Sequence, residues 1–235
     1  MKKIFKLILT IGLIPLLISC NEFEEINKSP NNVSNISPNF LLSSTTISLA
    51  SSYTNIAEFN GRVSPLLQYY QKNDGYKSEE FNALIWLPNS SSIWQGAYSN
   101  LVNIKAMSDL AIAEENVFIE AVALVYRAVF MDLITKTYGD APFSEINKLE
   151  EGIVFPKYDE QKEIYETLLI NLRTAKDMLE GISGNELPVL EGYDLLYDGD
   201  KDKWIKFVNS LRIRMCLLLN NKKGELSVDV DAEFQ

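Results

Sequence analysis

Apolar residues recur at spacings of three and four positions along most of this chain, and such spacing is typical of helices that bury one face. The pattern predicts helices at about 38–53 and 116–137, a helix capped by one of residues 90–92, a helix that opens at Asp159 and a last helix capped by Asp200 or Asp202. The segment 57–70 is ambiguous because Gly61 and Pro65 interrupt it. No alternating strand pattern competes with the helices. We therefore expect an all-α fold of stacked helical hairpins.

The apolar faces of these helices indicate how they pack. Segment 116–137 is apolar on nearly every side, which indicates a central helix among neighbours. Gly139 and Pro142 stop it, with glycine suited to the left-handed cap conformation. The helix after Asp159 has a seam for an antiparallel neighbour, made of Tyr165, Leu168, Leu172, Ala175 and Leu179. Two further faces consist of Trp94, Tyr98, Leu101 and Ile104, and of Trp204, Phe207, Val208, Leu211, Met215 and Leu218.

The last helix, at about 203–219, is apolar well beyond a single stripe. Ile213, Cys216 and Leu217 widen its main face, so the helix is suited to burial on more than one side. The residues after it form a short acidic segment that looks too small to cover the second side. We expect an exposed apolar patch on this helix, so that the isolated chain self-associates, melts with low cooperativity or relies on another chain for cover.

The N-terminal residues follow a different pattern. Three lysines precede an uncharged stretch, 7–18, which is far shorter than the roughly 20 residues of a membrane-spanning helix and is typical of a signal peptide. Leu17, Ser19 and Cys20 resemble a bacterial lipobox, in which the cysteine is acylated; two or more acyl chains hold a protein stably at a membrane. The alternative is an ordinary secretory signal that ends near a cysteine.

These patterns divide the chain into four parts. Residues 1–19 are the expected lipoprotein signal peptide, and residues 20–38, rich in Asn, Ser and Pro, are the lipidated cysteine with a flexible tether. Residues 39–222 form the helical domain, and residues 223–235 form a short acidic tail.

Composition excludes several classes of function. The formal net charge is −10, and without residues 1–19 it becomes −13, because 19 basic residues then face 32 acidic ones, so nucleic acid is not an expected partner. The chain has no histidine, which excludes Ser-His-Asp and Cys-His nucleophile pairs and the commonest zinc ligand sets. We expect no cofactor and no metal. A glycosidase remains a third alternative, but it would need two carboxylates that face each other across a cleft.

Several charged residues have structural explanations. Asp198, Asp200 and Asp202 alternate like the start of a calcium loop, but the twelfth position holds Asn209 instead of glutamate, so helix capping explains them better. We expect Cys216 to be a buried, inert thiol. Three arginines in helices need carboxylate partners that the sequence does not identify; they are Arg127, Arg212 and Arg214.

Exposed aromatic residues are the candidates for ligand binding, because sugar C–H surfaces stack on aromatic rings. Five fall around the one long irregular region, where binding residues tend to concentrate: Tyr69, Tyr70, Tyr76, Phe81 and Trp86. The alternative is that these rings pack under the loop. Trp94 and Trp204 are poorer candidates because both lie on apolar helix faces.

Several stretches together resemble the SusD/RagB-type nutrient-binding outer-membrane lipoproteins. The lipobox is followed by an acidic tract, Glu22, Glu24 and Glu25, which resembles an export signal for the outer face of the outer membrane. The other stretches are INKSPNN (26–32), WQGAYSNL (94–101), TYGDAPFSE (137–145), PKYDEQKEIY (156–165) and DLLYDGDKDKWIKFVNSLRIRM (194–215). Their order and spacing span almost the whole chain.

The resemblance implies tetratricopeptide-like helical pairs, no catalysis, and capture of glycans or other nutrients at the cell surface. It also implies a SusC-type TonB-dependent transporter as partner, with the lipoprotein as its lid, lipid-anchored and facing the exterior. Members of this family continue beyond the NSLRIRM helix, so we expect this chain to carry the N-terminal part of the scaffold. The alternative function is a helical-repeat adaptor on the outer membrane that binds only protein.

Overall fold

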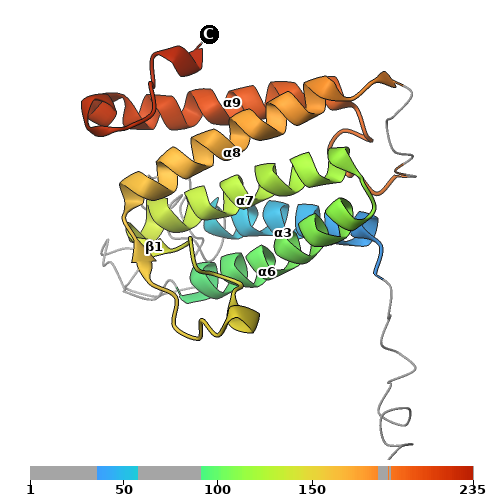
Figure 1. Ribbon diagram of the computed structural model, residues 1–235, viewed down its shortest axis with the longest axis horizontal. Coiled ribbons are helices and arrows are strands. Elements are labelled where there is room, and N and C mark those ends of the chain that lie inside the picture. The colour runs from blue at the N-terminus through green and yellow to red at the C-terminus, as the bar shows by residue number, and fades with distance from the viewer. Residues whose placement is uncertain (1–35, 58–90, 185–189, 191, 235) are drawn as a thin grey trace, which may run out of the picture. The chain divides into compact units, whose positions relative to one another are not determined.

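The computed structural model describes residues 36–57, 91–184, 190 and 192–234, and within them five α-helices (Figure 1). They are α3 (Pro38–Ala57), α6 (Ser91–Ala113), α7 (Val117–Tyr138), α8 (Gln161–Gly181) and α9 (Lys201–Leu219). Short 3₁₀ helices lie at Leu149–Glu151, Asn220–Glu225 and Ala232–Phe234. All these elements belong to the compact unit Ser37–Gln235. No helix in the described ranges is long and apolar enough to cross a membrane.

The helices stack in chain order, as Figure 1 shows for α6, α7, α8 and α9. Helix α3 packs on α6, α6 on α7, α7 on α8 and α8 on α9, and α7 also contacts α3 and α9. Short connections join α6 to α7 and make them a helical hairpin. The all-α fold of stacked hairpins is confirmed.

Helix α7 is the central element, as its sequence predicts. Of its 22 residues, 15 are buried, and the side chain of Asn116 caps it by accepting a hydrogen bond from the Ile119 amide at 3.1 Å. Gly139 ends the helix with φ 81° but with ψ −126°, so its conformation differs from the left-handed cap that we expected. Such a positive φ favours glycine because it has no Cβ.

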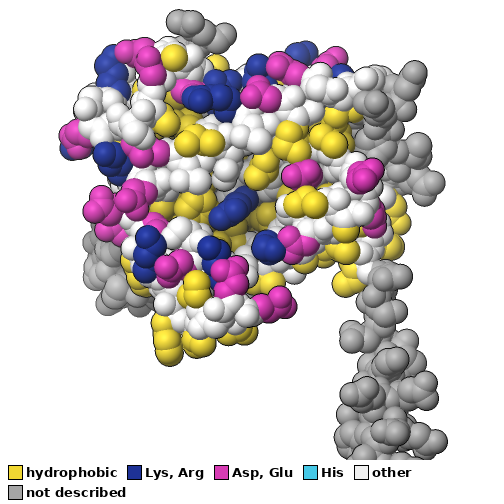
Figure 2. All heavy atoms as spheres, in the orientation of Figure 1, with side chains coloured by type: hydrophobic (Ala, Val, Ile, Leu, Met, Phe, Trp, Pro, Cys, Tyr) yellow, Lys and Arg dark blue, Asp and Glu magenta, His cyan; other side chains and the backbone are white. Residues whose placement is uncertain are grey.

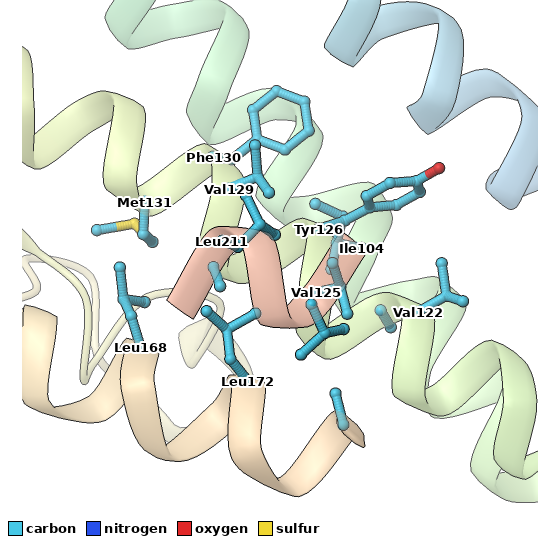
Figure 3. Close-up of a cluster of buried hydrophobic side chains, with 14 of the residues drawn as sticks. Ile104, Val122, Val125, Tyr126, Val129, Phe130, Met131, Leu168, Leu172 and Leu211 are labelled. Atoms are coloured by element: carbon cyan, nitrogen blue, oxygen red, sulfur yellow. The ribbon is translucent and has the colours of Figure 1, made fainter. Parts of the chain in front are cut away.

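The seam of α8 is confirmed, because all five of its predicted residues are buried. Figure 3 shows Leu168 and Leu172 of α8 and Leu211 of α9 grouped with side chains of α7, among them Val125, Val129 and Met131. Burial of one such Leu or Val side chain stabilises the fold by about 1.5–3 kcal/mol. Three helices therefore share one core.

The predicted start of α8 is wrong by two residues. Helix α8 begins at Gln161, and Asp159 lies in a short strand, β2 (Tyr158–Asp159), which pairs antiparallel with β1 (Ala141–Pro142). The Asp159 carboxylate accepts hydrogen bonds from the amides of Phe143 and Ser144 at 2.9 and 2.7 Å instead of capping the helix. The prediction that no strand forms is therefore wrong for these two strands, each of two residues.

Helix α9 is capped by Asp200, whose carboxylate accepts hydrogen bonds from the amides of Asp202 and Lys203 at 3.1 Å each. Its predicted apolar face is correct as far as Met215. Beyond that residue, Leu219 is buried at 8% exposure and Leu218 is 54% exposed. After Met215 the next residue on the buried face is therefore Leu219, four positions later and directly before the 3₁₀ helix Asn220–Glu225. The assignment of Leu218 to this face is wrong.

The predicted apolar patch on α9 is present but smaller than expected. Ile213, Leu217 and Leu218 are exposed, whereas Cys216 is fully buried. The segment after α9, which looked too small to cover a second side, does cover part of it: Val230 is buried in the core, and Glu233 forms ion pairs with Arg173 of α8 and Arg212 of α9.

Candidate functional site

The ligand-binding residues predicted from sequence lie outside the described residues. This applies to Tyr69, Tyr70, Tyr76, Phe81 and Trp86, and also to the lipidation candidate Cys20. Their roles stay predictions. The described residues contain a different group of surface aromatic rings, which the sequence did not reveal.

Four aromatic rings meet where α6 begins and α7 ends, and we call them the aromatic cluster: Trp94, Tyr98, Tyr138 and Tyr158. The Trp94 ring lies 4.7 Å from that of Tyr98 and 5.0 Å, edge to face, from that of Tyr138, measured between centroids. It is nearly parallel to the Tyr158 ring, at 6.3 Å and 25°. Such offset and perpendicular arrangements are the favourable ones for aromatic pairs.

The two tryptophans that looked alike in sequence have different environments. Trp204 is fully buried in the core, whereas Trp94 is only partly buried. Tyr158 is 65% exposed, so the stacked pair of Trp94 and Tyr158 reaches the surface. Helical periodicity could indicate that Trp94 lies on an apolar helix face, but it could not show that the ring lies near the surface where α6 begins.

The pairing of β1 with β2 brings Tyr158 to the cluster. Pro142 lies opposite Tyr158 in this pairing, and the Tyr98 hydroxyl donates a hydrogen bond to the Pro142 carbonyl at 2.8 Å. Burial raises the pKa of Tyr98 above its ordinary value, and the neighbouring Tyr158 and Asp159 raise it further. Tyr98 therefore stays a neutral donor that fixes the loop after α7 against α6.

Charged residues border the cluster but are already held by other contacts. Glu145 accepts a hydrogen bond from the Lys157 amide at 2.9 Å, and the Lys157 ammonium lies 3.3 Å from the carboxylate of Asp159. Burial alone would raise the pKa of Asp159, but hydrogen bonds from Ser144, Lys157 and Phe143 outweigh it and hold the pKa below its ordinary value. Asp159 is thus a stable carboxylate that fixes the loop, which is a structural task and does not suit a proton donor.

The loop between β1 and β2 adds apolar surface. Phe155 is 92% exposed, and Leu149 and Val154 are exposed as well. Figure 2 shows hydrophobic side chains over this loop at the lower edge of the face in view. Exposed large apolar groups in one place are typical of surfaces that bind a ligand or a partner.

Two aspartates of the described loop before α9 accept hydrogen bonds from backbone amides. Within the described residues, no group of three or more His, Cys, Asp or Glu side chains could hold a metal ion. Asp200 caps α9, and Asp194 accepts hydrogen bonds from the amides of Leu196, Tyr197 and Gly199. The carboxylates of Asp194 and Asp200 thus serve to hold the backbone of this loop and the first turn of α9.

Two of the three helical arginines have partners that fit a structural role. Arg212 pairs with the buried carboxylate of Glu233, its Nε and Nη2 atoms lying 2.8 and 2.6 Å from Oε2. Arg127 places its guanidinium 4.6 Å from the centroid of the Phe143 ring, and burial lowers its pKa. The expected partner of Arg127 was a carboxylate, and the contact found is an aromatic face.

The family model described as "Starch-binding associating with outer membrane" matches residues 30–234 of this chain. Among curated proteins, none matches the sequence.

Solved structures share the fold. A SusD/RagB family protein from Bacteroides thetaiotaomicron is 27% identical with a TM-score of 0.67, over 85% of this chain and 41% of that one. A SusD homolog from Bacteroides fragilis is 24% identical with a TM-score of 0.66, over 85% and 39%. A chitin-binding SusD homolog from Flavobacterium johnsoniae is 22% identical with a TM-score of 0.59, over 82% and 41%. The chain thus spans about two fifths of the length of these proteins.

Proposed function

The chain belongs to the SusD-like family, and we propose on this basis that it captures a glycan or another nutrient at the outer membrane and delivers it to a SusC-type TonB-dependent transporter. The family description names starch binding and association with the outer membrane. A homolog of the same fold is described as chitin-binding. Both descriptions favour a saccharide as the ligand.

The observation that carries this proposal is the exposed stack of Tyr158 on Trp94. A sugar ring presents a C–H surface that packs on an aromatic face and excludes water. Tyr158 offers such a face and stacks on Trp94, which in turn packs against Tyr98 and Tyr138. A ring that is already ordered loses little conformational entropy when a ligand binds.

The five loop aromatics predicted from sequence extend the same proposal. Tyr69, Tyr70, Tyr76, Phe81 and Trp86 belong to the segment that leads directly into α6, whose first turn carries Trp94. We propose that some of these rings widen the platform that the aromatic cluster begins. The lipid on Cys20 would hold this platform at the outer face of the outer membrane, in line with the family's association with that membrane.

Binding of saccharides to the full chain in detergent tests the proposal. Soluble starch and chitin oligosaccharides are the probes, read by affinity electrophoresis and calorimetry. Tyr158→Ala and Trp94→Ala should each weaken binding about tenfold, because an aromatic contact contributes about 1 kcal/mol or more. Phe40→Ala is the matched control, since Phe40 is an exposed aromatic residue of α3 outside the cluster. Equal binding by all three variants would contradict the proposed platform.

A protein-binding adaptor is the second candidate, and the exposure of Phe155 favours it. If the chain binds protein alone, Phe155→Ala should weaken a purified complex with the transporter, while starch and chitin oligosaccharides bind neither the parent chain nor any variant. Saccharide binding that depends on Tyr158 would exclude this candidate.

A further inference from the structure

A buried carboxylate joins three helices on the side of α7 that faces α8 and α9. Asp132 of α7 is fully buried, and its Oδ2 atom lies 2.6 Å from Nζ of Lys136 and 2.8 Å from Nη2 of Arg214 on α9. Its Oδ1 atom accepts a hydrogen bond from the hydroxyl of Tyr165 on α8 at 3.2 Å. Tyr53 of α3 completes the group: burial raises the pKa of its phenol, and the neighbouring Arg214 opposes this rise. We call these five residues the Asp132 cluster.

The Asp132 cluster contains two positive side chains and one negative side chain. One cation neutralises Asp132, yet both Lys136 and Arg214 pair with the same oxygen atom. The ion pairs therefore leave a surplus of one positive charge, on a chain whose formal net charge is −10. The side chains of Lys136 and Arg214 are 33% and 41% exposed, so this surplus charge is accessible from solvent.

Arg214 also has a donor that nothing in the described part of the chain satisfies. Its Nε atom is buried and has no hydrogen-bond partner among the described residues. An unmet buried donor costs stability, whereas a bound anion would accept from it and from the neighbouring Nη atoms in the fork geometry of guanidinium. Because Asp132 already holds Arg214 and Lys136 in position, a ligand would not have to order them.

We propose that the Asp132 cluster is a binding site for the carboxylate of an acidic saccharide, with Arg214 and Lys136 as its donors. This inference rests on the proposed function of glycan capture and adds a class of substrate, the uronic-acid-bearing glycans. A surplus of one positive charge matches one carboxylate, whereas a phosphate dianion would reverse the sign of the site. Leu217 and Leu218, exposed one turn beyond Arg214 on α9, supply apolar surface for the sugar ring.

Calorimetry with galacturonate on the full chain in detergent tests the inference, with galactose and acetate as comparison ligands. Galacturonate should bind and galactose should not, and the affinity for galacturonate should fall as salt is raised. Arg214→Lys keeps the positive charge beside Asp132 but removes the Nε donor and the fork, so it should weaken galacturonate binding tenfold or more. Lys136→Met removes the surplus charge and should weaken it as well. Lys105→Met is the control, because Lys105 pairs with Asp109 on the exposed side of α6.

Melting temperatures of the variants separate a ligand site from a purely structural network. Lys136→Met and Arg214→Lys should remain folded, since at least one cation still lies beside Asp132 in each variant. Galacturonate affinity that is the same in the parent chain and in Arg214→Lys would overturn the inference, as would equal binding of galactose and galacturonate. Binding of acetate as tight as that of galacturonate would overturn the saccharide assignment.

Failure of this inference can be distinguished from failure of the proposed function. If starch or chitin oligosaccharides bind through Tyr158 while galacturonate does not bind, the acidic site is excluded and glycan capture stands. If no saccharide of either kind binds, both are excluded.

Discussion

The indole Nε1 of Trp204 donates a hydrogen bond to Oδ2 of Asp194 at 2.7 Å, inside the core where α9 begins. The same carboxylate accepts from the amides of Leu196, Tyr197 and Gly199 at 3.1, 3.2 and 2.9 Å. One aspartate therefore satisfies the buried indole and shapes the loop that leads into the helix. Trp204 also lies edge to face with Tyr126 of α7, so the contact joins this loop to the central helix.

Truncation of Trp204 should be among the most destabilising single changes in the described part of the chain. We expect Trp204→Ala to lower the free energy of unfolding by about 3–5 kcal/mol, because it leaves a cavity in the core and removes one of the four hydrogen-bond donors to the buried Asp194 carboxylate. Trp204→Phe keeps most of the volume and should cost about 1–3 kcal/mol, from the lost N–H donor alone. Denaturant unfolding measures both values. A loss no larger than that of the control Phe40→Ala would contradict the assigned role of Trp204.

Removal of the Glu233 carboxylate should loosen the segment that follows α9. Glu233→Gln leaves Arg173 and Arg212 without their shared anion. Since Arg173 is half-exposed, we expect the free energy of unfolding to fall by only about 1–3 kcal/mol.

The reactivity of Cys216 reports whether this segment has loosened. Cys216 lies one turn from Arg212 and is fully buried, and burial raises the pKa of its thiol, so it should react slowly in the parent chain. In Glu233→Gln it should react faster with a thiol reagent, as mapped by mass spectrometry. Asp231→Asn is the control, because it removes only an exposed pair with Lys223.

The stabilising effect of Asp159 should depend on pH. Its pKa in the folded chain lies below the ordinary value of 3.8, so its contribution is complete at neutral pH and is lost as the pH falls through the folded pKa. Asp159→Asn should therefore cost about 1–3 kcal/mol at pH 7 and clearly less near pH 3. Urea unfolding at the two pH values measures the difference. The exposed Asp109→Asn should show little cost at either pH; a constant cost for Asp159→Asn would mean that its charge plays no part.

The exposed apolar residues of α9 should cause self-association. Light scattering and hydrophobic-dye binding should detect it in the chain without residues 1–19, and the double variant with Leu217→Lys and Leu218→Lys should reduce both signals without lowering the melting temperature. Ile170→Lys is the control, because Ile170 is an exposed apolar residue of α8. A parent chain that stays monomeric and binds no dye would show that this surface is too small to associate.

The lipid anchor can be tested by radiolabelled palmitate. The parent chain should incorporate the label and Cys20→Ala should not, because acylation requires the lipobox cysteine. Cys216→Ala keeps Cys20 and should be labelled like the parent chain. Equal labelling of Cys20→Ala and the parent would exclude the anchor.

Helical periodicity was enough to predict the described helices, because burial of one face repeats along each of them. The central position of α7, the seam of α8 and the cap of α9 by one of Asp200 and Asp202 were evident from local sequence. The wrong start of α8 comes from a residue whose local sequence suits either a helix cap or a loop contact. Asp159 stands where a helix cap could be, but it binds the amides of Phe143 and Ser144 in the loop after β1.

The candidate sites were harder to predict because they depend on contacts between distant residues. Trp94 and Tyr158 come together only through the pairing of β1 with β2, which comprises two residues in each strand and leaves no periodic signal. Asp132 and Arg214 are 82 positions apart, and the sequence alone offered Arg214 many possible partners. The predicted loop aromatics and Cys20 lie outside the described residues and stay predictions.

Packing in chain order has a consequence for how the protein folds. Since each helix mainly meets its neighbour in sequence, contact order is low and hairpins can form without waiting for distant segments. Helix α7 packs against α3, α6, α8 and α9, so it is the natural nucleus. In hydrogen exchange, the amides of α7 should open only with global unfolding, whereas those of α3 and α9 should exchange earlier.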